Sequence, residues 1–185
     1  MTTKTTTVIV GGVAGGMSTA ARLRRRDETM DIIVLEASGH VSFANCGLPY
    51  HVSGVIPERR SLLLQTPESL AARFNLDVRV NTRATAIDRE QQTVTTDTGD
   101  TIAYDHLVLS PGATPIIPPI PGIERALHLR TIEDVDAIIA ALTDDVASVA
   151  IIGGGFIGLE VAENMRHRGL DVTVIERAPQ ILTPL

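Results

Sequence analysis

Short runs of consecutive apolar residues alternate along the chain with glycine-rich turns and amphipathic stretches. Residues 7–10 and 31–36 are rich in Val, Ile and Leu without polar alternation, which predicts strands buried on both faces of a parallel sheet. Residues 17–26 between them suit a helix and follow a cluster of glycines. Together these segments predict the start of a β–α–β unit.

The same arrangement occurs again near the end of the sequence. Residues 149–152 and 172–176 predict two more buried strands, and the stretch between them opens with glycines and continues as a helix to about residue 167. Too little sequence follows residue 176 to cover a parallel sheet on both faces. We therefore expect the chain to be a fragment of a longer protein.

The region between the two copies predicts a different kind of structure. Residues 78–109 contain short alternating segments with a turn signal at residues 97–100, which predicts an antiparallel meander. The proline-rich stretch over residues 115–121 favours an extended connector and a domain boundary. Thr131, which is followed by acidic residues, is typical of a helix N-cap.

These segments predict an α/β fold with two dinucleotide-binding, Rossmann-like domains and an antiparallel β meander, of which the second domain is incomplete. We expect the first domain to occupy residues 1–118 and a connector with one helix to occupy residues 119–147. The second domain is expected to start at residue 148 and to be truncated at residue 185.

Composition and charge mainly exclude functions. The 185 residues are 44% hydrophobic, which is ample for a core. Twenty-two acidic residues against 16 basic ones give a net charge of −6, which argues against a nucleic-acid binder. No signal peptide is visible, and the apolar run at 149–161 is interrupted and shorter than the about 20 residues of a membrane helix. We expect a soluble, cytoplasmic protein without nucleic acid or membrane as a partner.

One cysteine, Cys46, is present in the whole sequence. A single cysteine excludes an intrachain disulfide and a multi-cysteine metal site, and the histidines show no metal-like spacing, so no metal is expected. Gly47 and Pro49 favour a loop that enters a helix, near whose N-terminus a thiolate is stabilised. The alternative is a buried structural cysteine.

Both glycine turns carry features of a dinucleotide site, in which the chain turns tightly, approaches a pyrophosphate and points a helix N-terminus at it. The second turn matches G-x-G-x-x-G at Gly153, Gly155 and Gly158, and Glu176 ends the next strand. The first turn, residues 11–16, has a valine at the second motif position. Two such folds suggest two dinucleotides, a flavin and a nicotinamide nucleotide.

Five segments together resemble the pyridine nucleotide-disulfide oxidoreductases: residues 11–16, 42–50, 110–115, 129–131 and 153–160. The sequence is most similar to their single-cysteine branch, which includes coenzyme A-disulfide reductases, rhodanese-fused persulfide reductases, and NADH oxidases and peroxidases. The resemblance covers the whole chain and is most specific around Cys46. It implies an FAD-dependent enzyme whose parent protein completes both domains, adds a dimerisation domain and forms a homodimer.

The resemblance also implies roles for individual residues. It assigns the FAD pyrophosphate and ribose contacts to Gly11, Gly12, Ala14, Gly15, Gly16 and Glu36. Further flavin contacts are expected from Ser110, Gly112 and Arg130. The nicotinamide nucleotide is expected at Gly153, Gly155, Phe156, Gly158 and Glu176, with Phe156 shielding the flavin until the nicotinamide arrives.

On the substrate side, the resemblance makes Cys46 the redox-active nucleophile beside the flavin. It also implies that Ser42 and Asn45 flank the bound disulfide. Contacts with coenzyme A are expected from Ser18, Arg22 and Arg25. A solvated basic helix face is the alternative for the two arginines.

The implied reaction passes a hydride from NAD(P)H to FAD, which then reduces Cys46 in a mixed disulfide or persulfide. NADH is expected over NADPH because Glu176 would repel a 2′-phosphate, although Arg177 opposes this. In the rival oxidase or peroxidase, the cysteine cycles through sulfenic acid and a histidine usually stands where this sequence has Ala14. A third alternative is a flavin-binding fragment without turnover, and we expect the isolated chain to be inactive. The acceptor stays open between coenzyme A disulfide, persulfide, polysulfide and oxygen or peroxide.

Overall fold

The computed structural model describes residues 4–183, which divide into two compact units. The first unit contains the described residues up to Phe43 and the segment Leu63–Thr114. The second unit contains Ala44–Leu62 and the described residues from Pro115 onward. The chain therefore enters the second unit twice, and each unit is built from two separate stretches of sequence.

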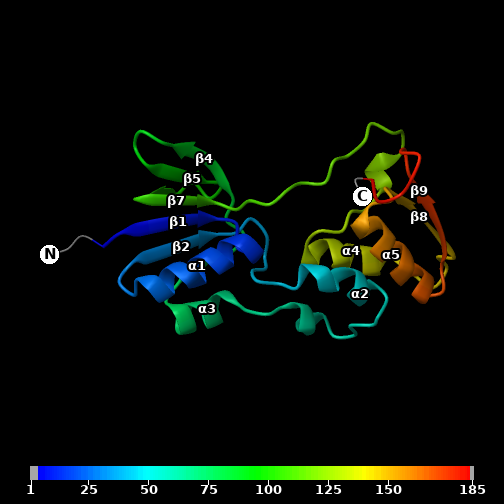
Figure 1. The fold of residues 1–185 in the computed structure, drawn as a ribbon, viewed down its shortest axis with the longest axis horizontal. Helices are drawn as coiled ribbons and strands as arrows, with labels where there is room; N and C mark the ends of the chain where they lie inside the picture. The colour runs from blue at the N-terminus through cyan, green and yellow to red at the C-terminus, as the bar shows by residue number, and fades with distance from the viewer. Residues whose placement is uncertain (1–3, 184–185) are drawn as a thin grey trace. The chain divides into compact units, whose positions relative to one another are not determined.

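A four-stranded parallel sheet forms the centre of the first unit, in the order β3-β2-β1-β7. Its strands are β1 (Thr6–Val10), β2 (Asp31–Leu35), β3 (Asp77–Arg79) and β7 (His106–Leu109). Helices α1 (Ala14–Arg26) and α3 (Pro67–Phe74) cover one face, where Ile9, Met17 and Leu70 belong to one buried cluster (Figure 1). This arrangement confirms the predicted first β–α–β unit, with its helix starting three residues earlier than expected.

An antiparallel sheet of β4 (Ala84–Asp88), β5 (Thr93–Thr96) and β6 (Thr101–Ala103) covers the other face. Val94 of β5 packs there with Val8 and Leu35, and none of the three side chains is more than 1% exposed. The predicted meander over residues 78–109 is therefore right in its middle and wrong at its ends. β3 and β7 pair in parallel with β2 and β1, because short apolar segments do not encode the direction in which they pair.

In the second unit, β8 (Ser148–Ile152) and β9 (Asp171–Ile175) pair in parallel, and α5 (Phe156–His167) connects them. Helix α4 (Ile132–Ala141) and the short helix α2 (Leu48–Val52) complete the unit, and α2 packs against both α4 and α5. The unit also contains three 3-10 turns, η1 (Asn45–Gly47), η2 (Arg59–Leu62) and η3 (Ile123–Arg125). The second β–α–β unit is thus confirmed.

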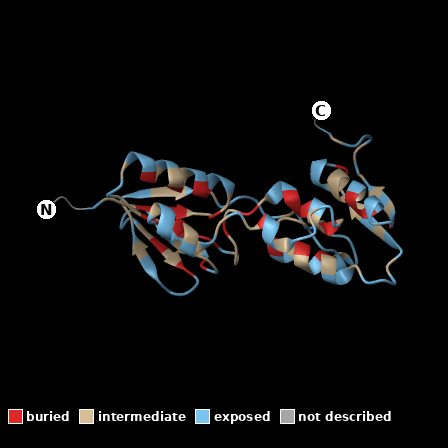
Figure 2. Cartoon of the chain, turned by 90° about the horizontal axis from the view of Figure 1, so that it is seen from below, coloured by how far each residue is buried: buried red, intermediate tan, exposed pale blue. Residues whose placement is uncertain are grey.

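Burial differs between the two β–α–β units (Figure 2). In β1, Thr7, Val8 and Ile9 are almost completely buried, as predicted for a strand covered on both faces. In β8 and β9, half-buried positions alternate with exposed ones, and Ile152 and Ile175 are about half exposed. The second pair of strands is therefore less completely covered than the first, as expected of a unit with too little sequence to cover both faces of its sheet, and α5 packs against both of its strands.

The structure contains the helix start and the connector that local sequence signals predict. Thr131 caps α4 as expected, since its side chain accepts a hydrogen bond from the Asp134 N–H and the Asp134 carboxylate accepts one from the Thr131 N–H. Residues 110–120 contain neither helix nor strand, in agreement with the predicted connector. The two units separate between Thr114 and Pro115. The assignment of residues 1–118, 119–147 and 148–185 to cofactor-binding domains stays a prediction, and the outermost residues of the first and last ranges lie outside the described part.

No helix within residues 4–183 is long and apolar enough to cross a membrane.

Candidate functional site

The first glycine turn connects β1 to α1 in a geometry that only glycine allows. Gly11 has a φ of +103°, a left-handed conformation that side chains rarely adopt, and its N–H donates to the Leu35 carbonyl at 2.8 Å. A Cβ added to Gly16 would overlap the Gly11 carbonyl oxygen. The helix therefore starts in close contact with the turn, as dinucleotide-binding folds require.

The second glycine turn, between β8 and α5, repeats this construction. Gly153 has a φ of +110°, and its N–H donates to the Ile175 carbonyl at 2.8 Å. A Cβ on Gly158 would overlap the Gly153 carbonyl oxygen, as one on Gly16 would overlap Gly11. The two turns thus have the same construction, with both glycine pairs five residues apart, although the first turn has Val13 where the second has Gly155.

Each turn is held by the acid at the end of its second strand. Glu36 is 9% exposed, accepts from the Gly12 N–H at 2.7 Å and also accepts from the N–H and hydroxyl of Ser38, both at 2.8 Å. Glu176 accepts from the Gly154 N–H at 2.7 Å and from the Ala178 N–H at 2.8 Å. Hydrogen bonds from the backbone of Ala178, and then of Gly154, lower the pKa of Glu176 below its usual value. A carboxylate has about four acceptor positions, so Glu176 retains capacity for a ribose hydroxyl.

The repeat extends beyond these acids, which the sequence analysis missed. The N–H of Ser42 donates to the Gly12 carbonyl at 3.0 Å, and the N–H of Leu182 donates to the Gly154 carbonyl at 2.9 Å. Both donors have left-handed backbones, with φ of +48° and +54°. Ser42 and Leu182 stand at the same spacing after their acids, and that spacing was the one available signal, because the residue types do not match.

Helices α1 and α5 differ from α3 and α4 in how they begin. In the described part of the chain, α3 and α4 each follow a threonine in a capping box, whereas α1 follows Val13 and α5 follows Gly155 without a side-chain cap. The five-residue helix α2 also lacks a side-chain cap. The first N–H groups of a helix have no partner within the helix. At α1 and α5 they lie at the glycine turns and are suited to bind a phosphate group.

Gly155 is the one motif glycine of the second turn that the fold itself does not require. Its φ is −80° with an extended ψ, and a Cβ placed there would meet nothing within 4 Å. Gly153 and Gly158, in contrast, are explained by their left-handed backbone and by close packing. A glycine without a structural reason in this position fits the close approach of a ligand to the backbone.

Ser110 and Gly112 follow β7, and Ser110 lies next to the first glycine turn. The N–H of Ser110 donates to the Val10 carbonyl at 2.8 Å, and a Cβ on Gly15 would overlap the Ser110 hydroxyl oxygen. Gly112 has a left-handed φ of +73°. The structure therefore brings Ser110 to the turn at Gly11, and the contact of Ser110 and Gly112 with a flavin stays a prediction.

The basic residues of α1 separate into two kinds. Ser18, Arg22 and Arg25 are exposed, and their spacing places them along one helix face. Arg24 is 7% exposed and donates to the carbonyls of Phe74 and Asn75 at 2.8 and 2.9 Å, so its role is structural. The exposure of the first three fits both the predicted substrate contact and a solvated face, and their role stays a prediction.

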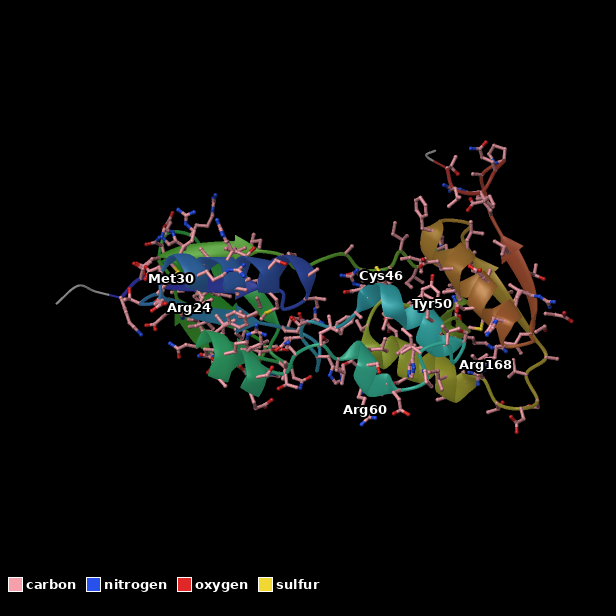
Figure 3. All side chains as sticks on the ribbon, turned by 60° about the horizontal axis from the view of Figure 1, so that its bottom comes forward. Arg24, Met30, Cys46, Tyr50, Arg60 and Arg168 are labelled. Atoms are coloured by element: carbon pink, nitrogen blue, oxygen red, sulfur yellow. The ribbon has the colours of Figure 1, made fainter. Side chains whose placement is uncertain are left out.

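Cys46 lies in the three-residue 3-10 turn η1, directly before α2, and is exposed (Figure 3). The alternative of a buried structural cysteine is therefore wrong. The N–H of Ala44 donates to the Leu62 carbonyl at 2.8 Å, and a Cβ on Gly47 would lie 2.8 Å from a methyl carbon of Leu62. Gly47 thus lets the cysteine turn pack closely against η2. The predicted helix after Cys46 has only five residues.

The predicted site residues are distributed over both units. The first unit contains the first glycine turn, Glu36, Ser42, Ser110, Gly112 and the exposed face of α1. The second contains Asn45, Cys46, Arg130, the second glycine turn, Phe156 and Glu176. Asn45 is exposed, Arg130 is half-buried and Phe156, at the start of α5, is 64% exposed. Within residues 4–183 no cluster of three His, Cys, Asp or Glu side chains is arranged to hold a metal ion.

Comparison with known proteins gives relatives for nearly the whole chain. The chain is 40% identical over 180 residues to a coenzyme A disulfide reductase of Staphylococcus epidermidis, covering 94% of this chain. It is 35% identical over 182 residues to an NADH oxidase of Methanocaldococcus jannaschii, covering 95% of this chain. In both cases the match spans 41% of the relative's length.

Two solved structures share the fold. Reduced Bacillus anthracis CoADR-RHD is 49% identical with a TM-score of 0.93, and the match covers 99% of this chain and 34% of that protein. A NAD-dependent persulfide reductase from A. fulgidus is 38% identical with a TM-score of 0.90, and the match covers 95% and 34%. The family model of the pyridine nucleotide-disulphide oxidoreductases matches residues 5–185. With paired glycine turns of one construction and this match over nearly its whole length, the chain belongs to the pyridine nucleotide-disulphide oxidoreductase family.

Proposed function

We propose that the parent protein is an FAD-dependent NAD(P)H oxidoreductase that reduces coenzyme A disulfide, or a persulfide or polysulfide, through Cys46. The observation that carries the proposal is one exposed cysteine in a chain with two dinucleotide turns of the same construction. The names of the relatives support a disulfide or persulfide as acceptor. Because the match spans only 41% of the relatives' length, the proposed reaction is assigned to the whole parent protein.

The first unit offers a fitting site for FAD. The uncapped N-terminus of α1 suits the pyrophosphate, and Glu36 at the end of β2 suits the adenosine ribose. Ser110 lies beside the same turn, and Ser110 and Gly112 suit further flavin contacts. FAD supplies two-electron transfer between a nicotinamide and a sulfur atom. Release of the chromophore from the purified parent protein by heat identifies it, and FMN would contradict the assignment.

The second unit offers the site for the nicotinamide nucleotide, for which we propose NADH over NADPH. Glu176 is ionised at neutral pH like any glutamate of ordinary or lowered pKa, so it favours ribose hydroxyls and repels a 2′-phosphate. Arg177 acts in the opposite direction and limits the preference. The ratio of kcat/KM for NADH to that for NADPH measures it, and Glu176→Gln should lower this ratio. A preference for NADPH in the unmodified enzyme would show that Arg177 dominates.

Cys46 carries the sulfur chemistry in this proposal. Its thiolate attacks one sulfur of coenzyme A disulfide, which forms a Cys46–coenzyme A mixed disulfide and releases one coenzyme A thiolate. Two electrons that originate from NAD(P)H then cleave the mixed disulfide, and with one proton the products are coenzyme A thiol and the Cys46 thiolate. One protein cysteine suffices because the substrate supplies the second sulfur atom.

An NADH oxidase or peroxidase is the second candidate, since one relative bears the name NADH oxidase. In that chemistry peroxide oxidises the cysteine to sulfenic acid, and a nearby group must transfer protons. Ala14, the first residue of α1, has no side chain for proton transfer. This residue favours the disulfide or persulfide reaction.

Cys46→Ser in the full-length parent protein tests the proposal. The variant should keep its flavin and lose NAD(P)H-dependent reduction of coenzyme A disulfide and persulfides. Retained reduction would refute the mechanism, and strong peroxide turnover with poor disulfide turnover in the unmodified enzyme would favour the second candidate. The same assay on the 185-residue chain should show no turnover.

We also propose that the parent is a cytoplasmic homodimer, which light scattering and fractionation would test.

A further inference from the structure

Helix α2 is too short to hold its own position. It has five residues, and isolated helices of that length are not stable in water. The last carbonyls of a helix also lack partners within the helix. Cys46 lies in the turn that leads directly into α2. The groups that hold α2 therefore also determine where the Cys46 turn lies.

Two side chains at the C-terminal end of α5 form hydrogen bonds with the C-terminal end of α2. A guanidinium N–H of Arg168 donates to the Val52 carbonyl at 2.8 Å. The hydroxyl of Ser53 donates to the Oδ1 atom of Asn164 at 2.6 Å. Figure 3 labels Arg168 together with Cys46 and Tyr50, so the reader can follow the end of α5 and the helix that it holds.

Asn164 is a buried polar residue with a defined orientation. It is 3% exposed, and its Nδ2 atom donates to the Glu160 carbonyl at 2.8 Å within α5. This bond places the amide nitrogen, and Oδ1 consequently faces Ser53. Asparagine is a poor residue for a helix interior, and a buried amide costs free energy unless it is hydrogen-bonded. The stability of α5 alone therefore does not explain this residue, whereas the bond to Ser53 does.

The N-terminal end of α5 directly follows Gly155 of the second glycine turn. One continuous helix thus carries the proposed nicotinamide nucleotide turn at its start and holds the cysteine-bearing segment near its end. We propose that Asn164 and Arg168 are positioning residues for Cys46, which fix α2 and the turn before it to α5. The proposal rests on the proposed function in one respect, that Cys46 is the reacting group.

Three substitutions in the full-length parent protein test this role. Asn164→Leu keeps a similar volume and removes the acceptor, Ser53→Ala removes the same bond from the α2 side, and Arg168→Ala removes the bond to Val52. Arg166→Ala is the matched control, because Arg166 lies on the same helix and its side chain bonds to Leu170 and Asp171 instead.

Hydrogen exchange and cysteine alkylation are the readouts that do not depend on activity. Each of the three substitutions should speed amide exchange in residues 48–53 roughly five- to tenfold, the effect of about one hydrogen bond. Exchange in α4 and β8 should stay unchanged. The rate at which iodoacetamide alkylates Cys46 should shift at least twofold in the same variants and stay constant in Arg166→Ala. Ser53→Ala combined with Asn164→Leu should have less than the summed effect of the two single substitutions, because both remove the bond between Ser53 and Asn164. Each also removes a bond of its own, from Ser53 to the Tyr50 carbonyl and from Asn164 to the Glu160 carbonyl.

In the activity assay, the kcat for disulfide reduction should fall about tenfold while the KM for NADH and the flavin content stay unchanged. Unchanged amide exchange at residues 48–53 would overturn the proposal, and so would faster exchange that is equal throughout the second unit. Faster exchange confined to residues 48–53 together with an unaltered kcat would also overturn it. If Cys46→Ser retains turnover, the proposed function fails. Exchange and alkylation then still decide whether Asn164 and Arg168 hold the cysteine turn.

Discussion

At the scale of single residues, the two glycine turns separate glycines that the fold requires from one that it does not. Gly16 and Gly158 allow α1 and α5 to start against the carbonyls of Gly11 and Gly153. Gly155 has open space around the position of a Cβ and a backbone that any residue adopts. The three motif positions of the second turn therefore have different physical reasons, and substitutions can distinguish them.

Gly158→Ala should lower the free energy of unfolding by about 1–3 kcal/mol, because the new methyl group overlaps a backbone carbonyl. This loss should outweigh the better helix propensity of alanine, which is worth about 1 kcal/mol. Gly155→Ala is the control for folding and should change stability by less than about 0.5 kcal/mol. It should nevertheless weaken NADH binding to the parent protein. Urea denaturation and NADH titration measure both effects, and equal stability losses in the two variants would contradict the reasoning.

Glu176 should titrate at a lower pH than an ordinary glutamate, because N–H groups of Ala178 and Gly154 stabilise its charged form. A folded-state pKa below the unfolded value means that its contribution to stability is complete above the unfolded pKa of about 4.3. That contribution is lost as the pH falls through the lower folded pKa. The amide resonance of Gly154 should therefore shift below about pH 4.3, and Glu176→Gln should abolish this titration. A midpoint above that pH would argue against the hydrogen-bonded carboxylate.

At the scale of elements, the four longer helices of the described chain begin in two ways. Thr66 and Thr131 close capping boxes at α3 and α4, so the first N–H groups of these helices have partners within the chain. Helices α1 and α5 leave their first N–H groups without a side-chain cap at the glycine turns. A ligand with a phosphate group can satisfy those N–H groups, which agrees with the proposed cofactor sites.

Thr131→Ala should destabilise the second unit by about 1 kcal/mol, because it removes the acceptor for the Asp134 N–H. Thr131→Ser keeps that acceptor and should lose only a small part of this amount. Thermal or urea denaturation of the parent protein measures the difference between the two variants. Equal stability of the alanine and serine variants would mean that the capping box contributes nothing to α4.

At the scale of the whole molecule, the cysteine segment belongs to the second unit although it follows the first unit in sequence. Residues Ala44–Leu62 pack with the residues after Pro115, and Arg59 binds Asp136 of α4 through paired hydrogen bonds of 2.8 and 2.7 Å. The segment that bears Cys46 and the proposed nicotinamide nucleotide turn are therefore parts of one folded unit.

Hydrogen exchange under mild denaturant should show this grouping, because residues of one cooperative unit open together. Amides of residues 44–62 should exchange with the same denaturant dependence as those of α4 and α5. Amides of α1 and β2 should form a separate group. If residues 44–62 followed β2 instead, the division of the chain into these two units would be wrong.

The sequence by itself determined the features that depend on neighbouring residues. Both β–α–β units, both glycine turns with their acids, the cap at Thr131 and the proline-rich connector were predictable, because each arises from local backbone geometry or local hydrogen bonds. The resemblance to the family also came from contiguous motifs, which need no knowledge of distant contacts. Cys46 was singled out as a candidate from its sequence context alone.

Only the tertiary structure decided what depends on residues far apart in the chain. β3 and β7 join the parallel sheet, and Ser110 reaches the first glycine turn, because the partners that select them are distant in sequence. The exposure of Cys46 and the hydrogen bond from Ser53 to Asn164 likewise follow from packing that no local pattern encodes. Apolar periodicity specifies which face of an element is buried, whereas the partner on that face is chosen by the fold as a whole.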